Sequence, residues 1–381
     1  MSELSYLEKL LDGVEVEWRN LGDTSLFEIA NNGRKPVKAS LRIAGETPYY
    51  GANNIQDYVD GYTHDGEYVL IAEDGSASLE NYSIQYATGK FWANNHVHVV
   101  RGKERVHSRF LYHYLCIVNF LPFLTGGGRA KLTKGQLIEI PVPIPCPDNP
   151  EKSLAIQSEI VRILDKFTAL TAEVTAELTL RKKQYNYYRD QLLSFKEGEV
   201  EWKTLGEVAV IGTGNHDTQD AIEHGKYIFY ARGREPLKLN VFDFDETAII
   251  TAGDGAGVGK VFHYAKGKYA LHQRAYRIVP NAFMNPRFVY HYITAYFFTY
   301  IQKASVSSSV TSLRRPMFLK FPIPVPPSEE QARIVEILDK FDTLTNSITE
   351  GLPREIELRQ KQYEYYRDLL FSFPKPETVS N

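Results

Sequence analysis

The chain has 381 residues, 43% of them hydrophobic, which is enough to bury the cores of two or three domains. It holds only two cysteines, Cys116 and Cys146, whose spacing argues against a disulfide framework or a structural zinc site. The net charge of −3 gives no general attraction to nucleic acid, so any contact with DNA must depend on local basic groups.

The sequence gives no indication of export or of membrane insertion. The N-terminus lacks the basic region and long apolar run of a signal peptide. The most apolar stretch, residues 110–124, is interrupted by His113, Asn119 and Pro122 and is too short to span a bilayer. We therefore expect a cytoplasmic protein without contact to a membrane.

An internal duplication organises the chain. Three blocks occur twice in the same order, and the longest is Gln-x-x-Ile-Val-x-Ile-Leu-Asp-Lys-Phe. The sequences between the blocks agree only in outline, which indicates two units with a common frame and different contents. The matching blocks are residues 16–22 with 200–206, 157–167 with 331–341, and 183–190 with 361–368.

The variable part of each unit predicts a small α+β domain. Short β-rich runs bounded by Gly and Asp, such as residues 68–72, predict strands. An Asp-Gly pair follows such a run in each unit, at Asp74 and Asp254, and predicts a turn between strands. The segments Arg-Phe-x-Tyr-His-Tyr, which begin at Arg109 and Arg287, predict the starts of helices.

The glycine-rich segment 253–260 does not fit a phosphate-binding loop. The first glycine of that motif would fall on Asp254, and the residue after Lys260 is Val261 rather than Ser or Thr. The sequence also lacks the tetrapeptide of amino-methyltransferases, an H-E-x-x-H metal helix and a G-x-S-x-G nucleophile turn. A stand-alone nuclease or methyltransferase would need such residues, so we predict that the chain is not an enzyme.

Each domain is followed by proline-rich extended chain and then by a long helix. Residues 140–145 and 321–327 alternate proline with apolar residues, which excludes a helix there. From residue 155 to 195 apolar side chains recur at alternating steps of three and four, the seam of a coiled coil, and the second copy begins after an expected N-cap at Ser328. A helix of this length reaches about 60 Å. It suits a spacer, although a helical hairpin that only holds the domains together is the alternative.

The two long helices differ by four residues. The distance from Asp165 to Arg181 is 16 residues in the first copy, and that from Asp339 to Arg359 is 20 in the second. A step of four is close to one helical turn, so the apolar seam returns to nearly the same face. The surplus lies around Pro353, which predicts a kink or an interruption of the second helix.

This arrangement resembles the specificity subunit of type I restriction–modification enzymes over essentially the whole chain. The resemblance rests on two dissimilar units, each closed by an Ile-Pro-x-Pro segment and followed by the duplicated helix that ends in Lys-Gln-Tyr-x-Tyr-Tyr-Arg-Asp. It implies an α+β architecture with two similar target recognition domains, joined by two long antiparallel coiled-coil helices in a pseudo-twofold repeat. The implied segments are 1–150 (first domain with an N-terminal leader), 151–198 (central spacer helix), 199–327 (second domain) and 328–381 (C-terminal spacer helix and tail).

The resemblance also implies a function. Each domain would recognise one half of an interrupted sequence in double-stranded DNA. The helices would bind two copies of a DNA adenine methyltransferase subunit and, with restriction/translocase subunits, complete the enzyme. Those partners would hold S-adenosylmethionine, ATP and magnesium, and no cofactor or metal is expected in this chain. A coiled-coil structural adaptor with ligand-binding heads is the alternative.

The first set of candidate DNA contacts lies in the last loop of each domain. In the resembling family this loop carries small residues and a basic residue toward DNA. The corresponding loops here are residues 126–131 and 307–315. Backbone amides and hydroxyls there would hold phosphates beside basic side chains, and a flexible surface loop is the alternative. The residues of this set are Arg129, Lys131, Ser308, Arg314 and Arg315.

The second set has amide, imidazole and guanidinium groups suited to base edges. Polar groups that stabilise the fold are an equally good explanation for part of it. The set comprises Asn53, Asn54, Asn95 and His96 in the first unit and Arg232, Arg234, His272, Gln273 and Arg274 in the second. The candidates for partner binding are the aromatic residues of the helix seam, Phe167, Tyr185, Tyr188, Phe341, Tyr363 and Tyr366.

Overall fold

The computed structural model describes residues 10, 13–126, 130–196, 198–304 and 314–373. The chain forms two units, of which unit 1 consists of Met1–Glu173 and Ile356–Asn381, and unit 2 of Val174–Glu355. Both boundaries fall within long helices, so each unit contains one domain together with the helix parts that pack on it. The four segments expected from the sequence divide the chain differently, because they separate the helices from the domains.

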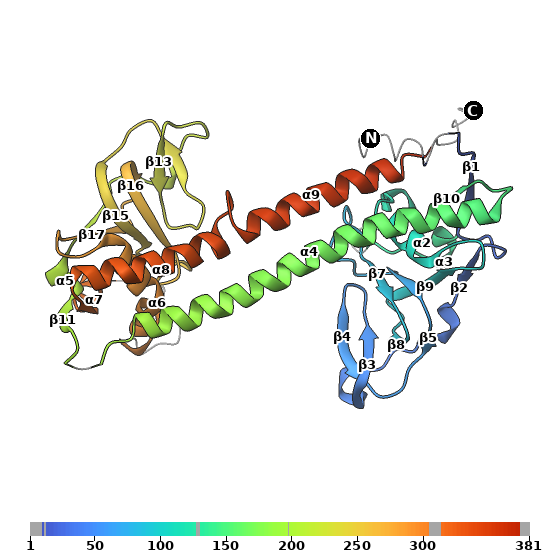
Figure 1. Cartoon of the computed structure of the whole chain (residues 1–381), viewed down its shortest axis with the longest axis horizontal. Helices are drawn as coiled ribbons and strands as arrows, with labels where there is room; N and C mark the ends of the chain where they lie inside the picture. Colours follow the sequence, from blue (N-terminus) through green and yellow to red (C-terminus); the bar gives the residue numbers. More distant parts are fainter. Residues whose placement is uncertain (1–9, 11–12, 127–129, 197, 305–313, 374–381) are drawn as a thin grey trace. The chain divides into compact units, whose positions relative to one another are not determined.

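Unit 1 contains a strand pair, two four-stranded sheets and short helices (Figure 1). The pair is β1·β10, and the sheets have the orders β2-β9-β6-β7 and β4-β3-β8-β5. The strands are β1 (Val16–Asn20), β2 (Phe27–Ile29), β3 (Ala44–Tyr50), β4 (Ile55–Val59), β5 (His64–Asp65), β6 (Tyr68–Ala72), β7 (Ile84–Ala87), β8 (Lys90–Ala93), β9 (Val97–Gly102) and β10 (Pro141–Pro145). The helices are α2 (Ser108–Leu115), α3 (Lys134–Leu137) and α4 (Pro150–Leu192), and α4 continues into unit 2.

Unit 2 contains the pair β11·β18 and one six-stranded sheet of order β12-β17-β15-β16-β13-β14. Its strands are β11 (Glu201–Thr204), β12 (Ala209–Thr213), β13 (Tyr227–Tyr230), β14 (Leu237–Leu239), β15 (Phe244–Ala252), β16 (Phe262–Leu271), β17 (Ala275–Pro280) and β18 (Pro322–Val325). Its helices are α5 (Leu205–Val208), α6 (Pro286–Ala304), α7 (Arg315–Leu319) and α8 (Ser328–Asn346), while α9 (Leu352–Leu370) leads back to unit 1. None of the described helices is long and apolar enough to cross a membrane.

The two domains share one topology, which confirms the α+β class and the repeat predicted from the sequence. In unit 1, β9 lies between β2 and β6, as β17 lies between β12 and β15 in unit 2. The parallel pair β3·β8 corresponds to the parallel pair β13·β16. The domains differ in that β7 and β8 are separate strands, with Gly89 between them, whereas β16 is continuous, although Gly267 within it also has a positive φ of +84°.

In each unit, the duplicated Val-Glu-Trp block pairs with the proline-rich segment. β1 runs antiparallel to β10, with Trp18 opposite Pro143, and β11 runs antiparallel to β18, with Trp202 opposite Pro324. Proline has no N–H to donate, so a two-stranded ribbon suits it better than the middle of a sheet. Each tryptophan also packs edge-on against a tyrosine of α2 or α6, with ring centroids 6.2 and 6.4 Å apart. The expected extended conformation of both proline segments is confirmed.

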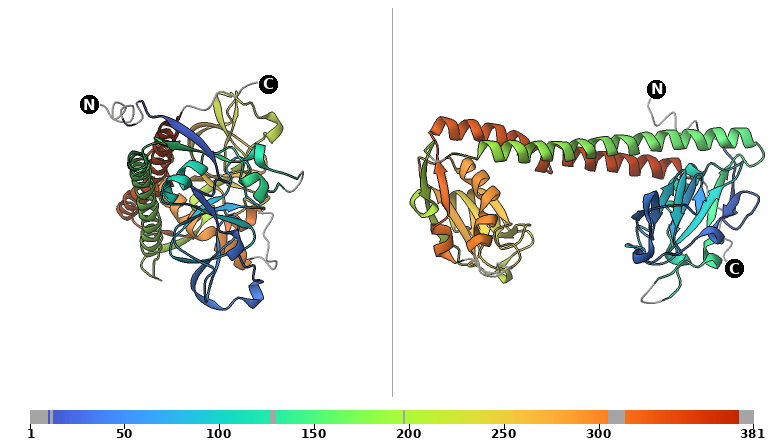
Figure 2. Two further views of the ribbon diagram at one scale, coloured as in Figure 1. Left: turned by 90° about the vertical axis from the view of Figure 1, so that its right-hand side faces the viewer. Right: turned by 90° about the horizontal axis from the view of Figure 1, so that it is seen from below.

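The main core of each unit joins the sheet, the domain helix and the long helix. In unit 2, α6 lies along the sheet that contains β15, β16 and β17, and α8 packs on α6 (Figures 1 and 2). The Arg-Phe-x-Tyr-His-Tyr segments open α2 and α6, as predicted from the sequence. Representative core residues are Val69, Phe110 and Leu164 in unit 1 and Ile249, Phe288 and Leu338 in unit 2.

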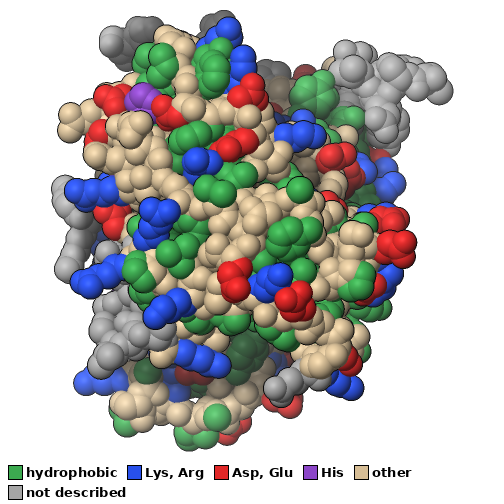
Figure 3. Space-filling view, turned by 90° about the vertical axis from the view of Figure 1, so that its left-hand side faces the viewer, with side chains coloured by type: hydrophobic (Ala, Val, Ile, Leu, Met, Phe, Trp, Pro, Cys, Tyr) green, Lys and Arg blue, Asp and Glu red, His purple; other side chains and the backbone are tan. Residues whose placement is uncertain are grey.

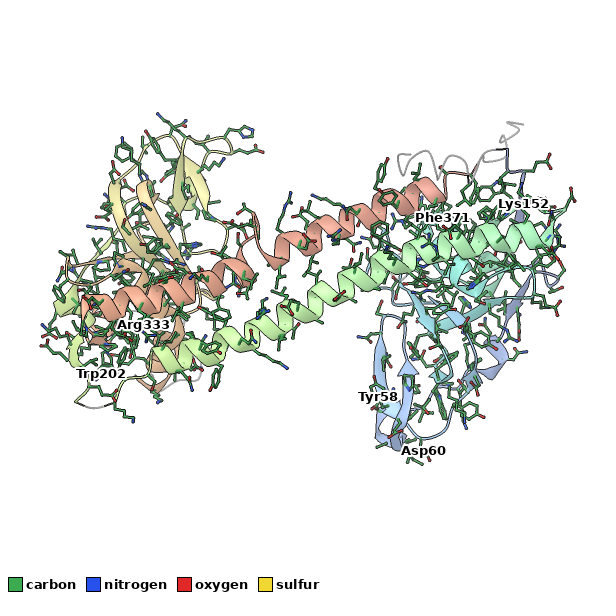
Figure 4. All side chains as sticks on the ribbon, viewed as in Figure 1. Tyr58, Asp60, Lys152, Trp202, Arg333 and Phe371 are labelled. Carbon is green, nitrogen blue, oxygen red and sulfur yellow. The ribbon has the colours of Figure 1, made fainter. Side chains whose placement is uncertain are left out.

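The end of α9 closes the core of unit 1. Phe371 follows the last residue of this helix (Figure 4), and its ring packs on Phe110 and Tyr114, with centroids 5.3 and 5.7 Å apart. Leu10 packs against the same core, although most of the expected N-terminal leader lies outside the described residues. The C-terminal repeat is therefore a structural part of the first domain.

The long helices begin slightly differently from the expectation. α4 starts at Pro150, one residue before the expected spacer segment 151–198 and five before the first residue of the apolar pattern, because proline fits the first turn of a helix, where its missing N–H leaves no bond unmade. Asn149 caps this turn by accepting a hydrogen bond from the backbone N–H of Lys152 at 3.0 Å. α8 starts at Ser328, and Pro327 holds the cap position, so the N-cap expected at Ser328 is wrong by one residue.

The second long helix is interrupted where the sequence has its four-residue surplus. α8 ends at Asn346 and α9 begins at Leu352, with Pro353 in its first turn. Gly351 has φ +87°, a left-handed conformation that breaks the helix and that other residues adopt with strain. The interruption predicted from Pro353 is confirmed, and α4, which lacks these residues, is continuous over 43 residues.

A carboxylate of α4 binds the domain helix α2 of unit 1. Asp165 accepts hydrogen bonds from Arg109 Nε at 2.9 Å and from His113 Nε2 at 2.8 Å, both on α2. His113 is fully buried, and its Nδ1 lies 3.3 Å from the hydroxyl of Tyr363 on α9. We call this cluster the Asp165 clamp.

The same cluster recurs in unit 2 as the Asp339 clamp. Asp339 of α8 accepts hydrogen bonds from Arg287 Nε at 2.8 Å and from His291 Nε2 at 2.7 Å on α6. Burial alone would raise the pKa of Asp339, but the hydrogen bonds from His291 and Arg287 outweigh it and lower the pKa. The carboxylate is thus ionised at neutral pH and is compensated by the arginine.

A buried glutamine near the start of each long helix adds a second attachment. Gln157 Oε1 accepts from the backbone N–H of His107 at 2.8 Å, and Gln331 Oε1 accepts from that of Asn285 at 2.7 Å. Both glutamines lie in the duplicated block and satisfy the backbone just before α2 or α6. The duplicated residues thus hold each domain on its helix.

The burial of His113 predicts that the stability of unit 1 depends on pH. Burial lowers the pKa of this imidazole from 6.5 to about 4, although the hydrogen bond to Asp165 opposes the shift. Between these values the unfolded chain takes up a proton that the folded unit does not bind, so stability falls as the pH falls through this window. The free energy of unfolding should therefore fall between pH 7 and pH 4.5, and this fall should be about 2 kcal/mol smaller in His113→Gln. Urea unfolding at both pH values is the measurement.

The control for this measurement is Lys152→Ala, which changes an exposed residue of unit 1 (Figure 4). We expect this variant to keep the pH dependence of the unchanged protein. If the glutamine variant loses as much stability as the unchanged protein on acidification, His113 is not the group that titrates.

Candidate nucleic-acid interface

Two loops meet at one edge of the main sheet in each unit. β6 and β9 are antiparallel neighbours, with Ala72 opposite Val97, so the loop that leaves β6 lies beside the turn that enters β9. In unit 2 the same applies to β15 and β17, with Ala252 opposite Ala275. We call these places the Asp74 edge (residues 73–77 and 94–96) and the Asp254 edge (residues 253–257 and 272–274).

The Asp74 edge joins a histidine and a lysine to two acids. His96 Nδ1 lies 2.5 Å from Asp74 Oδ1, and the two side chains are 49% and 39% exposed. Glu73 accepts from Arg34 at 2.6 Å and from Lys131 at 3.0 Å. Burial raises the pKa of Glu73, but these two hydrogen bonds outweigh it and lower the pKa. Lys131 is therefore anchored at this edge while about half of its side chain stays exposed.

Asn53 is occupied by its own chain. Its Nδ2 donates to the carbonyl oxygen of Gly75 at 2.8 Å, and its Oδ1 accepts from the backbone N–H of Ala77 at 2.8 Å. Its side chain thus supports the loop of the Asp74 edge. Asn54, Asn95 and His96 are exposed too, so all four candidates in unit 1 lie at the surface, and Asn53 differs in that its amide is bound by its own loop.

Two guanidinium groups meet at Asp254. Arg232 Nη1 lies 2.9 Å from Oδ1 of this acid, and Arg274 Nη1 lies 3.0 Å from its Oδ2. Burial raises the pKa of Asp254, but the two arginines outweigh it and lower the pKa. Arg232 is 40% exposed and Arg274 63% exposed, so both cations are oriented by the acid and remain accessible.

A cavity of about 620 Å³ lies beside Asp254. Three glycines in its wall leave the backbone accessible, and its lining includes three cations and two acids. One of those acids is already paired with arginines, so the remaining charge suits an anionic ligand. The charged residues of the lining are Arg232, Arg234, Lys260, Asp254 and Glu235.

Gln273 and His272 differ although they are neighbours in the same turn. Gln273 is exposed, and its Nε2 donates to Asp217 Oδ2 at 3.0 Å. His272 is 1% exposed, stacks on Phe229 at 6.3 Å between ring centroids, and accepts at Nδ1 from the backbone N–H of Arg274 at 2.9 Å. These contacts make His272 a support of the turn, and its expected role as a base contact stays a prediction.

The last loop of each domain is described only in part. Arg129 and Ser308 lie outside the described residues. Arg314 and Arg315 are exposed at the start of α7, where Arg314 holds the N-cap position. Figure 3 shows one face of the molecule, on which several Lys and Arg side chains lie along one margin, with acidic and apolar side chains interspersed elsewhere.

The seam aromatics of the long helices stack in equivalent pairs. In unit 1, Phe167 of α4 stacks on Tyr366 of α9 at 5.0 Å, and in unit 2, Phe341 of α8 stacks on Tyr188 of α4 at 5.6 Å. The two phenylalanines hold the same place in the duplicated block, as do the two tyrosines. In each unit, therefore, the phenylalanine of one copy of the duplicated sequence stacks on the tyrosine of the other copy.

Tyr363 and Tyr185 also pack within their units, against His113 and Phe341. Burial raises the pKa of both tyrosines to about 12. These internal contacts account for the seam aromatics, so their role in partner binding stays a prediction. Two exposed tyrosines, Tyr187 (59% exposed) and Tyr365 (54%), were not predicted as candidates for partner binding. The sequence does mark them, because an aromatic residue outside the apolar seam occurs at the same position in both copies.

From the sequence, Asp74 and Asp254 were predicted only to lie in turns between strands. In the structure each acid orients a basic or imidazole side chain of the neighbouring turn. The signal was available, because the Asp-Gly pair follows the same buried strand in both copies. An acid repeated in a region otherwise divergent points to an ion-pair partner.

Comparison with known proteins agrees with this geometry. The family model "Type I restriction modification DNA specificity domain" matches residues 14–180 and 197–358. A putative type I restriction enzyme specificity subunit of Haemophilus influenzae is 46% identical over 395 residues, covering 97% of this chain and 98% of the relative. The EcoR124I/EcoR124II specificity subunit of Escherichia coli is 42% identical over 422 residues, covering 100% of both chains. The crystal structure of the S subunit of a type I system from M. genitalium has the same fold, with TM-score 0.66, 15% identity and coverage of 96% and 98%.

Proposed function

The chain belongs to the family of type I restriction–modification DNA specificity subunits, and we propose that each of its units recognises one half of a bipartite double-stranded DNA target. One observation carries this proposal. The two units share topology, clamps and strand pairing, but the Asp74 edge presents an imidazole where the Asp254 edge presents guanidinium groups. One frame with two chemically different edges suits two different base sequences.

The chain would provide recognition, and partner subunits would provide catalysis. The relatives are specificity subunits of restriction enzymes, and the sequence lacks motifs for methyl transfer or phosphodiester cleavage. The exposed Tyr187 and Tyr365 lie at equivalent positions of the duplicated block, so the chain offers one surface twice. Two identical copies of a DNA adenine methyltransferase subunit would fit such a duplication, with restriction/translocase subunits completing the enzyme.

The test of this function is a map of methylated adenines across the genome, with and without the gene. We expect a motif of two defined half-sites separated by unspecified base pairs, which disappears on deletion and returns on complementation. A methylation pattern unchanged by deletion would instead favour a structural adaptor whose heads bind another ligand.

Removal of the basic side chains at α7 should weaken DNA binding without changing its sequence preference. Each phosphate contact contributes about 0.9 to the slope of log affinity against log salt concentration. We therefore expect Arg314→Ala with Arg315→Ala to lower affinity for all sequences and to reduce that slope by about 1 to 2. The measurement is a salt titration of DNA binding by the chain reconstituted with its methyltransferase subunit.

The matched control removes the same charge elsewhere, by Lys152→Ala with Lys340→Ala, both exposed residues of the long helices. We expect this control to leave the slope close to that of the unchanged protein. An equal effect of both double variants would show that the net charge, rather than the position of Arg314 and Arg315, governs the slope.

The duplicated helix surface predicts a complex with two methyltransferase copies. We expect native mass spectrometry at saturating partner to give one chain with two copies, and Tyr187→Ala or Tyr365→Ala to weaken the binding of one copy only. The two substitutions change exposed side chains, so both variants should fold. A complex that saturates at one copy would refute the twofold arrangement.

The continuous helix α4 predicts how the gap between half-sites is set. Four helix-forming residues inserted after Ala172 would lengthen α4 by about 6 Å. At about 3.4 Å per base pair, the preferred gap should grow by one or two base pairs while both half-sites stay unchanged. Methylation mapping of this variant is the measurement.

The structure offers a matched control for this insertion. The same four residues placed between Asn346 and Leu352 extend the existing break rather than a helix, so we expect them to leave the gap unchanged. An unaltered gap in the α4 variant, with its half-sites still recognised, would show that α4 does not set the spacing.

A further inference from the structure

We propose that Arg274 recognises a guanine in the half-site of unit 2, and that Asp254 is the residue that positions it. This inference rests on the proposed function and assigns one base contact within it. Its basis is the geometry of the Asp254 edge, where an exposed guanidinium is fixed by an acid from a different loop.

The backbone and the side chain of Arg274 are both held in place. Its N–H donates to His272 Nδ1 at 2.9 Å, and that imidazole is buried against Phe229. Its Nη1 lies 3.0 Å from Asp254 Oδ2. An arginine has five N–H donors in a rigid plane, so a bond from Nη1 to the acid leaves donors for a second partner on the exposed side.

Guanine is the base that this arrangement suits. In the major groove it presents two adjacent acceptors, N7 and O6, and the paired N–H groups of an arginine match them. Adenine presents a donor beside N7 and cytosine presents a donor, so neither accepts two parallel bonds. A guanidinium already oriented by Asp254 loses little side-chain freedom on making this contact.

The ion pair also argues against a simple phosphate contact. Asp254 is shared by Arg232 and Arg274, so the three groups together carry one positive charge rather than two. An acid beside a phosphate contact would weaken the attraction on which such a contact depends. Arg234 is the better phosphate contact at this edge, since it is exposed, lines the cavity and forms no ion pair among the described residues.

Unit 1 carries the same positioning device with a different reading group. His96 enters β9 as Arg274 enters β17, and Asp74 orients it as Asp254 orients Arg274. An imidazole presents a single nitrogen, Nε2, once Nδ1 is engaged by the acid. The two edges should therefore affect different half-sites, which gives each variant a control in the other unit.

The test uses the chain reconstituted with its methyltransferase subunit and a DNA library in which every position of both half-sites is varied. For Arg274→Ala we expect discrimination at one guanine, on either strand of one half-site, to fall by about 10- to 100-fold. Arg274→Lys keeps the charge but lacks the paired donors, so it should lose discrimination at the same position. Asp254→Asn should cause a smaller loss there, because the guanidinium is present but less well oriented.

Two controls separate base recognition from other roles. Arg234→Ala should reduce the salt dependence of binding and leave all base preferences intact, while His96→Ala should alter only the opposite half-site. Thermal unfolding checks that each variant is folded.

The outcomes distinguish this inference from the proposed function. An unchanged protein without a bipartite preference overturns the proposed function itself. Three outcomes overturn the guanine assignment alone. The bipartite preference could survive Arg274→Ala unchanged, the loss could fall on a base pair without guanine, or Arg274→Lys could keep full discrimination.

Discussion

Each unit depends on one carboxylate of a long helix that accepts hydrogen bonds from an arginine and a buried histidine of the domain. Asp165 holds α2 on α4, and Asp339 holds α6 on α8. The two histidines are fully buried while the carboxylates keep 39% and 36% of their side-chain surface exposed, so loss of the carboxylate leaves a buried imidazole nitrogen without its hydrogen bond. The domain helix also packs on the sheet, so the clamp and the core together attach the sheet to the long helix.

The secondary structure shared by the two units was predictable because it depends on local sequence patterns, most of which occur in both copies. Alternating prolines specified the extended strands, the Arg-Phe-x-Tyr-His-Tyr segments specified the starts of α2 and α6, and Pro353 marked the break between α8 and α9. Each of these features depends on residues close together in sequence. The clamps were not predicted, although their residues are repeated, because nothing in the sequence relates the register of a domain helix to that of the long helix.

The site was less predictable, since it depends on strand register and on burial. Arg232 and Arg274 meet Asp254 from two other loops, which only the pairing of the strands brings together. The side chain of His272 could bind a base edge as well as those of its neighbours Gln273 and Arg274, but it is buried. In the same way Tyr185 is half-buried against Phe341 while Tyr187, two residues later in the same block, is 59% exposed. Residue type alone does not separate these cases.

The interruption of the second long helix identifies the place where this chain can be divided. A cut at residues 347–351 leaves α8 and α9 whole, whereas a cut in α4 would destroy a continuous helix. Most of α9 belongs to unit 1 and α8 to unit 2, and Leu370 at the end of α9, with Phe371 directly after it, packs into the core of unit 1. The C-terminal segment therefore has the properties of a detachable peptide, and two separately expressed fragments should reassemble by complementation in trans.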